Sequence, residues 1–250
     1  MPETLYIGKN IIELDVVDST NNYASKLVAN KKALEGTVVI AYFQGEGKGQ
    51  RGNVWVSEPG KNLTFSLVLN PKKVAPGEAF VISKVVSLAI CNYLETILEE
   101  DVFIKWPNDI YVGQKKICGI LIENQFKGKN FESSIVGIGL NVNQSNFQNL
   151  QQVTSLLLEL KKELELKAVL GNLLKSIELV YLRFQREGIS AIHKEYLTNL
   201  LFIGEVRSYK TSQSEIRGKI TNVLSNGQLE IETTDGQLFN FDIKELEFVF

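Results

Sequence analysis

The sequence has little of the chemistry on which many hydrolases and metalloenzymes depend. Histidine occurs once in 250 residues, as His193, so a Ser-His-Asp triad, a histidine zinc site or a two-histidine relay would have to use this residue or do without. His193 lies in a stretch of helical composition, and we predict that it is a surface residue. The chemistry is therefore expected to depend on lysine, arginine, backbone amides and a metal held by oxygen ligands.

Other features are scarce as well. The two cysteines, Cys91 and Cys118, have neither metal-ligand nor disulfide-framework spacing, which favours a reducing compartment. The N-terminal segment shows no signal-peptide pattern, and no run approaches the ~18 uninterrupted apolar residues that span a bilayer. Lys and Arg total 27 against 29 for Asp and Glu, so the overall charge gives no support to a nucleic-acid binder. These absences predict a cytoplasmic protein with no membrane or nucleic-acid partner.

The chain has ample material for a folded core, with 44% hydrophobic and 22% charged residues. Strand and helix patterns alternate up to residue 202, where a main domain is expected to end. The expected strands are 37–43, 62–69, 117–122 and 134–142. The expected helices are 19–30, with Asp18 or Ser19 as N-cap, 78–99, and a block over 154–199 in which Gly171 and Gly188 mark interruptions or ends.

The pattern changes after residue 202. Residues 203–250 contain short strand patterns and no helix pattern. Asn226-Gly227 and Asp235-Gly236 predict hairpins with type I′ turns, which need positive φ. We expect a small barrel-like module packed against the main domain.

A glycine-rich segment follows the strand expected at 37–43. Residues 45–52 read GEGKGQRG, and four glycines in eight residues allow the backbone to approach a ligand and direct N–H groups at an anion. Lys48 and Arg51 add positive charge, but the spacing matches neither a Walker loop nor the dinucleotide fingerprint. The alternative is a flexible surface turn. Trp55, just beyond, either covers a ligand or belongs to the core.

Three further segments carry polar or glycine residues at strand positions. In KWPND (105–109), Asp109 either binds magnesium or forms part of an Asx turn. In KKICGILIE (115–123), the lysines either face an anionic transition state or form a solvated pair at a hairpin, and Gly119 indicates close approach of a ligand or backbone. GIGLNVN (137–143) again leaves room within a strand, and Asn141 supplies a donor and an acceptor.

Together and in this order, these segments resemble the biotin protein ligase family. The matching elements are DSTN at 18–21, Gln44 with the glycine-rich segment through Trp55, KWPND, KKICGILIE and GIGLNVN. The resemblance implies an α+β fold: a mixed, largely antiparallel sheet flanked by helices, of the class II synthetase-like type, over residues 1–202. It also implies a small all-β SH3-like C-terminal domain over residues 203–250.

The resemblance implies roles for individual residues as well. The ureido ring and tail of biotin would be held by Ser19, Thr20, Asn21, Gln44, Gly47, Lys48, Gly49, Gln50, Lys116, Gly119, Gly137 and Gly139. ATP would be bound by Lys48, Arg51, Asn53, Trp55, Asn108, Asp109, Lys116 and Asn141. Lys116, Arg51 and Asp109 would be catalytic, with Lys116 contacting both the biotin carboxylate and the α-phosphate and Asp109 holding Mg²⁺.

The implied reaction has two steps. Biotin and ATP form biotinyl-5′-AMP and pyrophosphate, and biotin is then transferred to a lysine of a biotin carboxyl carrier domain. Both reactants of the first step are anionic, so lysine, arginine and Mg²⁺ must offset their repulsion. A lipoate–protein ligase and a biotin- or adenylate-sensing module without transfer activity remain as alternatives, and homodimerisation stays open.

Two departures from the family pattern affect these expectations. Gln50 stands where many members have an arginine that helps to retain the adenylate, and we expect Arg51 and backbone amides to hold it instead. Only 18 residues precede Ser19, fewer than the helix-turn-helix domain of repressor-type members needs, so a monofunctional ligase is expected.

Overall fold

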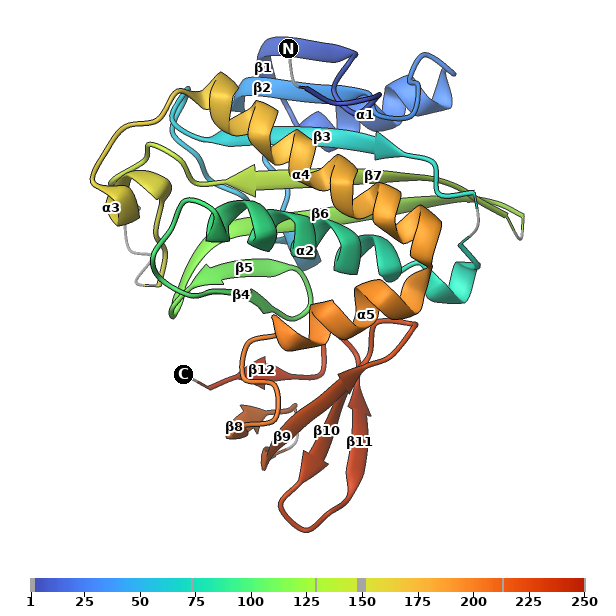
Figure 1. The fold of residues 1–250 in the computed structure, drawn as a ribbon, viewed down its shortest axis with the longest axis vertical. Coiled ribbons are helices and arrows are strands. Elements are labelled where there is room, and N and C mark those ends of the chain that lie inside the picture. The colour runs from blue at the N-terminus through green and yellow to red at the C-terminus, as the bar shows by residue number, and fades with distance from the viewer. Residues whose placement is uncertain (1–2, 73, 129, 148–151, 213, 250) are drawn as a thin grey trace.

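The computed structural model describes residues 3–72, 74–128, 130–147, 152–212 and 214–249. Its larger part is a seven-stranded sheet of order β1-β2-β3-β7-β6-β5-β4 (Figure 1). The strands are β1 (Ile11–Val17), β2 (Val38–Gln44), β3 (Leu63–Leu69), β4 (Val102–Lys105), β5 (Asp109–Val112), β6 (Lys115–Lys127) and β7 (Asn130–Leu140). Only the β1–β2 pair among these strands is parallel, so the expected mixed, largely antiparallel sheet is confirmed.

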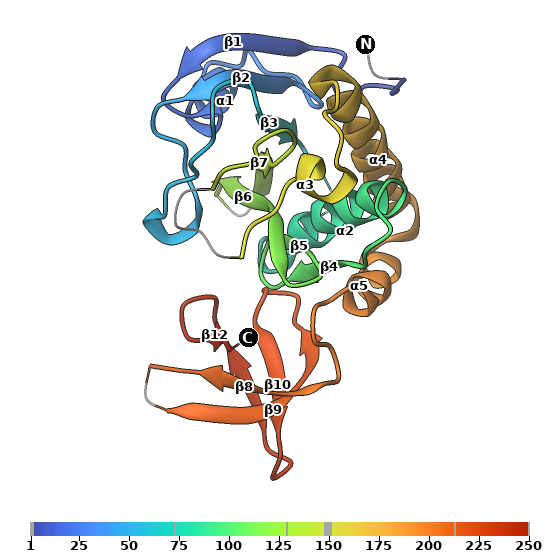
Figure 2. The same cartoon turned by 90° about the vertical axis from the view of Figure 1, so that its left-hand side faces the viewer.

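Helices cover both faces of this sheet. The short α1 (Thr20–Ala29), with Ser19 as N-cap, lies on one face, whereas α2 (Val81–Glu95) and α4 (Leu166–Glu187) pack together on the other (Figure 2). The remaining helices are η1 (Gln50–Gly52), η2 (Pro76–Glu78), α3 (Leu156–Leu160) and α5 (Ile189–Thr198). Because strand side chains alternate, β3 directs Phe65 and Leu67 to the α2–α4 core and Ser66 to the α1 face, where polar groups gather.

The apolarity of α2 is explained by this packing. The stretch Pro76–Glu95 is long and apolar enough to cross a membrane by composition, but 72% of its most apolar window is buried inside the protein. Val85, Leu88 and Ala89 have no exposed surface. A core helix enclosed by a sheet and a second helix needs this composition.

The expectation that Gly171 interrupts a helix is wrong, whereas Gly188 does end one. Gly171 lies inside α4, and Gly188 adopts a φ of 82° at its C-cap. The apolar face of α4, with Leu170, Leu173 and Leu174 buried, anchors the helix across the glycine. Packing therefore overrides the low helix propensity of a single glycine.

Gly171→Ala should stabilise the protein. A Cβ at this position meets no atom within 4 Å, so the substitution adds helix propensity without a clash. The free energy of unfolding should rise by about 0.5–1 kcal/mol. Chemical denaturation with an unchanged m-value checks this, and a loss of stability would contradict it.

The C-terminal part is a five-stranded sheet of order β11-β10-β9-β8-β12. Its strands are β8 (Val206–Lys210), β9 (Glu215–Val223), β10 (Leu229–Thr233), β11 (Leu238–Phe241) and β12 (Glu247–Phe248). Hairpin turns occur at both predicted places, but the type I′ assignment is wrong. Gly227 and Gly236 have φ of 94° and 86°, whereas neither Asn226 nor Asp235 adopts positive φ. Each hairpin instead has a three-residue loop, and the glycine at its last position is a β-bulge residue with positive φ.

The β9–β10 turn contacts the main sheet's helices through a buried lysine. Lys84 on α2 is 3% exposed, and its Nζ donates to the carbonyl of Val223 at 2.9 Å. The same Nζ lies 3.0 Å from Nδ1 of His193, which is half-buried, so the predicted surface position of His193 is wrong. No local pattern in α2 indicates that Lys84 makes this contact. The junction thus joins α2, α5 and the C-terminal sheet.

Lys84 should make stability depend on pH. Burial lowers the pKa of Lys84 to about 8, whereas the unfolded chain keeps this lysine protonated up to its ordinary pKa of about 10.4. Between these values the unfolded state binds more protons, so this lysine makes stability rise with pH, by up to about 1.4 kcal/mol per unit. The difference in unfolding free energy between wild type and Lys84→Met, measured from pH 7 to 10, should show this rise. Shifts of tyrosines and cysteines cancel in the difference, and a difference that does not change with pH would contradict the assignment.

Candidate active site

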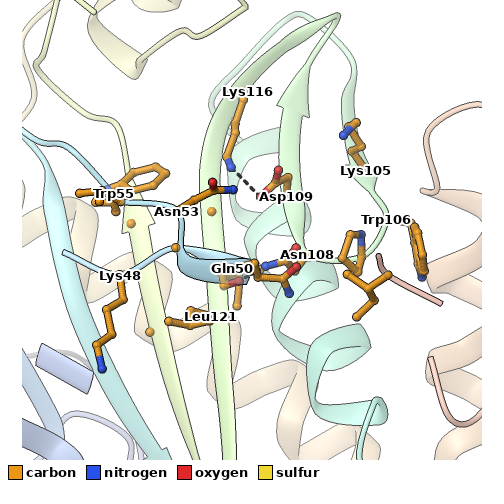
Figure 3. Close-up of a pocket in the computed structure, with 18 of the residues that line it drawn as sticks. Lys48, Gln50, Asn53, Trp55, Lys105, Trp106, Asn108, Asp109, Lys116 and Leu121 are labelled. Carbon is orange, nitrogen blue, oxygen red and sulfur yellow. Dashed lines mark hydrogen bonds and ion pairs between the residues drawn. The ribbon is translucent and has the colours of Figure 1, made fainter. Parts of the chain in front are cut away.

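A cavity of about 790 Å³ lies where the main sheet, the glycine-rich loop and the C-terminal sheet meet (Figure 3). Most of the predicted site residues line it. These are Ser19, Thr20, Asn21, Gln44, Lys48, Gly49, Gln50, Asn53, Trp55, Asn108, Asp109, Lys116, Gly119, Gly137 and Gly139. The sequence motifs therefore converge on a single place in the fold.

Three predicted residues stand apart. Gly47 lies behind the lining, where a Cβ would come within 2.4 Å of the backbone oxygen of Trp55. Asn141 is 2% exposed, and its Nδ2 donates to the carbonyl of Thr154 at 3.0 Å. The side chain of Arg51 lies outside the described part of the chain, although its backbone belongs to η1.

A chain of hydrogen bonds connects the uncharged side chains of the cavity. The N–H of Thr20 donates to Oε1 of Gln44 at 2.7 Å, which ties the first turn of α1 to the end of β2. The hydroxyl of Ser66 donates to Oδ1 of Asn21 at 2.6 Å, and Nδ2 of Asn21 donates to Glu123 at 2.8 Å. All these side chains are therefore fixed before a ligand binds.

The glycines of β6 and β7 make room for protein side chains. A Cβ on Gly137 would lie 2.4 Å from Oδ1 of Asn21, and a Cβ on Gly139 would lie 2.3 Å from Cε2 of Trp55. Gly119, paired with Gly139, would place its Cβ 2.9 Å from the same indole. Trp55 thus packs flat on two glycines, and its Nε1 is buried with no hydrogen-bond partner in the described part of the chain.

An ion pair lies beside this indole. Nζ of Lys116 is 2.7 Å from Oδ1 of Asp109 and 5.6 Å from the centre of the Trp55 ring. Figure 3 shows the pair facing the cavity from neighbouring strands. Both side chains keep solvent contact, with exposures of 28% and 22%, so an incoming anion can reach the ammonium group. Lys116 is thus a fixed cation with a carboxylate that a ligand can replace.

Asn108 holds two backbone segments together beside the site. Its side-chain amide donates to the carbonyl of Ile120, and its own carbonyl accepts from the N–H of Ile120 at 3.1 Å. These contacts fix the KWPND segment to β6 next to Gly119. They explain why a short polar residue stands directly before β5.

The C-terminal sheet completes the cavity, which sequence patterns did not predict. Its contribution consists of Lys210, Thr211, Ser212 and residues 243–248. Nζ of Lys105 lies 4.9 Å from the ring centre of Phe248, so KWPND contacts β12 directly. Residues far apart in sequence meet here, and no local signal marks such a contact.

Lysines outnumber acidic side chains in the lining. The lining contains five lysines and three acidic residues: Lys48, Lys105, Lys116, Lys210 and Lys244, against Asp109, Glu245 and Glu247. Among the described residues, no group of three or more His, Cys, Asp or Glu is arranged to hold a metal. Magnesium commonly takes one or two carboxylates together with substrate phosphates, so Asp109 fits such a shared site. The arrangement suits a ligand that carries phosphates.

Comparison with known proteins identifies the family. The model of the biotin/lipoate A/B protein ligase family matches residues 13–141. The chain belongs to this family. Bifunctional ligase/repressor BirA of Bacillus subtilis is 31% identical over 248 residues, which cover 97% of this chain and 76% of that protein. The biotin–protein ligase of Homo sapiens is 34% identical over 149 residues, covering 58% of this chain and 20% of that protein.

Solved structures of biotin protein ligases have the same fold. The Aquifex aeolicus enzyme in complex with biotin and ATP aligns with a TM-score of 0.79 and 29% identity, covering 96% of this chain and 98% of that one. The Leishmania major enzyme with biotinyl-5-AMP aligns with a TM-score of 0.62 at 21% identity, over 94% of this chain and 99% of that one, and indicates the shared fold. The predicted membership among biotin protein ligases is thereby confirmed.

Proposed function

We propose that this ligase converts biotin and ATP into biotinyl-5′-AMP and pyrophosphate and then transfers biotin to a lysine ε-amine. One observation carries the proposal: the cavity combines an uncharged hydrogen-bonding region at Thr20 and Gln44 with a lysine-rich region around Lys116. Biotin has a neutral ureido ring and an anionic tail, and ATP is a polyanion. The two regions match the two ends of the adenylate that joins them.

In the first step, an oxygen of the biotin carboxylate attacks the α-phosphorus as the bond to pyrophosphate breaks. Two anions must approach each other, so a nearby cation lowers the barrier. Lys116 is placed for this role, because its ammonium group faces the cavity and its partner Asp109 can turn toward a metal. Magnesium, held by Asp109 and the phosphates, would neutralise further charge. Fixing both reactants in one cavity supplies much of the remaining acceleration.

In the second step, the neutral ε-amine of the acceptor lysine attacks the acyl carbon. A C–N bond forms, the C–O bond to AMP breaks, and the amine loses a proton. The family implies a biotin-carrier protein as acceptor, and we propose a biotin carboxyl carrier domain. Trp55, packed on Gly119 and Gly139 within the lining, would present an apolar surface to the adenylate. Retention of the adenylate by Arg51 and loop amides belongs to the same proposal.

We also propose a division into a catalytic domain at 1–202 and an SH3-like domain at 203–250. The switch to a separate five-stranded sheet after α5 supports it. We further propose a cytoplasmic enzyme without a membrane or nucleic-acid partner, which the two free cysteines and the nearly balanced charge of the chain support.

The proposed function is tested by ATP–pyrophosphate exchange. Exchange should depend on added biotin, and lipoate should not support it. Transfer to the lysine of a purified carrier domain, followed by mass spectrometry, tests the second step. A response to lipoate alone would assign the chain to the other branch of the family. Absence of exchange with either acid would indicate a sensing protein.

A further inference from the structure

We propose that Ser66 and Glu123 are positioning residues that set the direction of the hydrogen-bond chain behind Thr20. In this arrangement Thr20 offers a hydrogen-bond acceptor to the ligand and Gln44 offers a donor. The proposal rests on the proposed function, since it concerns how the same cavity selects a ureido ring. Ser66 lies in none of the motifs, and Glu123 ends the KKICGILIE segment without any sign in the sequence of such a role.

The direction is set first at Asn21. Its Nδ2 lies 2.8 Å from a carboxylate oxygen of Glu123 and 3.4 Å from the carbonyl of Leu121. Both partners can only accept, so the amide nitrogen must face them. The side chain is 3% exposed and lies flat over Gly137, which leaves Oδ1 toward Ser66.

The next step is decided at Ser66. Its hydroxyl oxygen is 2.6 Å from Oδ1 of Asn21 and 2.8 Å from Oγ1 of Thr20. An amide oxygen cannot donate, so the single proton of Ser66 goes to Asn21. Ser66 can then only accept from Thr20, because two oxygens 2.8 Å apart without a proton between them would repel.

Thr20 is therefore left as an acceptor. Its one proton can go to Ser66 at 2.8 Å or to Oε1 of Gln44 at 3.1 Å, and it goes to Ser66, because that contact is shorter and Oε1 of Gln44 already accepts from the N–H of Thr20. Oε1 of Gln44 already accepts from the N–H of Thr20, which leaves Nε2 of Gln44 as the donor. An acceptor beside a donor complements a ligand with adjacent N–H and C=O groups, as in a cyclic urea.

Glu123 makes the opposite direction unfavourable. If the amide of Asn21 turned over, its buried Oδ1 would face the carboxylate of Glu123 and the carbonyl of Leu121, and acceptors would meet with no donor between them. Glu123 itself is exposed on β6. Replacing Glu123 therefore removes the preference for one orientation of the Asn21 amide and has little effect on the hydrophobic core.

The experiment measures discrimination between biotin and cyclic carbamate analogues, in each of which one ureido N–H is replaced by oxygen. Both regioisomers are assayed by ATP–pyrophosphate exchange. Wild type should reject the isomer whose ring oxygen faces Thr20 by about 100-fold or more in kcat/KM, because two acceptors then meet. In Ser66→Ala the proton of Thr20 is free to turn to the ligand, so discrimination should fall at least about tenfold.

Three further variants complete the test. Glu123→Leu should reduce discrimination, and Glu123→Gln should reduce it as well, because the amide of Gln can donate as well as accept and no longer excludes the turned-over amide of Asn21. Ser134→Ala is the matched control, since Ser134 is equally buried and donates to Oδ1 of Asn124 at 2.5 Å away from the cavity. Its discrimination should equal that of wild type.

The outcomes distinguish failure of this proposal from failure of the proposed function. Unchanged discrimination in both Ser66→Ala and Glu123→Leu overturns the proposal while the ligase activity stands. If Ser66→Ala does not fold, Glu123→Leu alone decides. Absence of biotin-dependent exchange in wild type overturns the proposed function itself.

Discussion

Replacing Lys116 by alanine should reduce the rate of biotin-dependent ATP–pyrophosphate exchange by about 100- to 1,000-fold, the range found when one charge-stabilising group is removed from an active site. The ammonium group lies 2.7 Å from Asp109 at the cavity wall. Its loss removes a cation and leaves the carboxylate of Asp109 facing the phosphates. The effect should fall on kcat, because the charge matters most as the bond to pyrophosphate breaks.

Two comparisons make this prediction specific. Lys115→Ala removes the exposed neighbour at the start of the same strand and should have little effect. Asp109→Asn in the Lys116→Ala background also removes the proposed magnesium ligand and should lower the rate further. Equal losses in Lys115→Ala and Lys116→Ala would contradict a specific role for Lys116.

Gly139→Ala should displace Trp55 and weaken ligand binding. The new Cβ would lie 2.3 Å from Cε2 and 2.6 Å from Nε1 of the indole. Gly139 pairs with β3 on one side and β6 on the other, so its backbone cannot yield, whereas Trp55 lies on a loop. We expect a loss of about 1–3 kcal/mol in stability and a rise in KM for biotin.

A double-mutant cycle measures the clash. In the Trp55→Ala background, Gly139→Ala should no longer reduce stability, because the indole is absent. Gly171→Ala serves as the control, since a Cβ there meets no atom within 4 Å. Additive effects of Trp55→Ala and Gly139→Ala would show that the two residues do not contact each other.

Local patterns predicted the elements and the place of the site. The alternation in β3 and the apolar spacing of α2 are strong signals because each strand or helix buries a defined face. The glycines at 119, 137 and 139 indicated close approach, but the sequence did not tell that Asn21 and Trp55 occupy the space. Such contacts depend on pairing between strands that are far apart in the chain.

Other features depended on packing alone. Gly171 is carried within α4 by its buried neighbours, and Lys84 is buried because carbonyls of the C-terminal sheet accept from it. Ser66 and Glu123 look like ordinary polar strand residues until the register of β3 and β6 brings them beside Asn21. Motif resemblance identified the ligands, whereas the residues that orient the binding groups required the fold.

The most direct test of the account is a crystal structure with a non-hydrolysable analogue of biotinyl-5′-AMP. We predict that the ureido ring contacts Thr20 and Gln44 and that the phosphate lies within hydrogen-bonding distance of Nζ of Lys116. An analogue bound with its phosphate away from Lys116, or with its ureido ring outside the Thr20–Gln44 region, would contradict it.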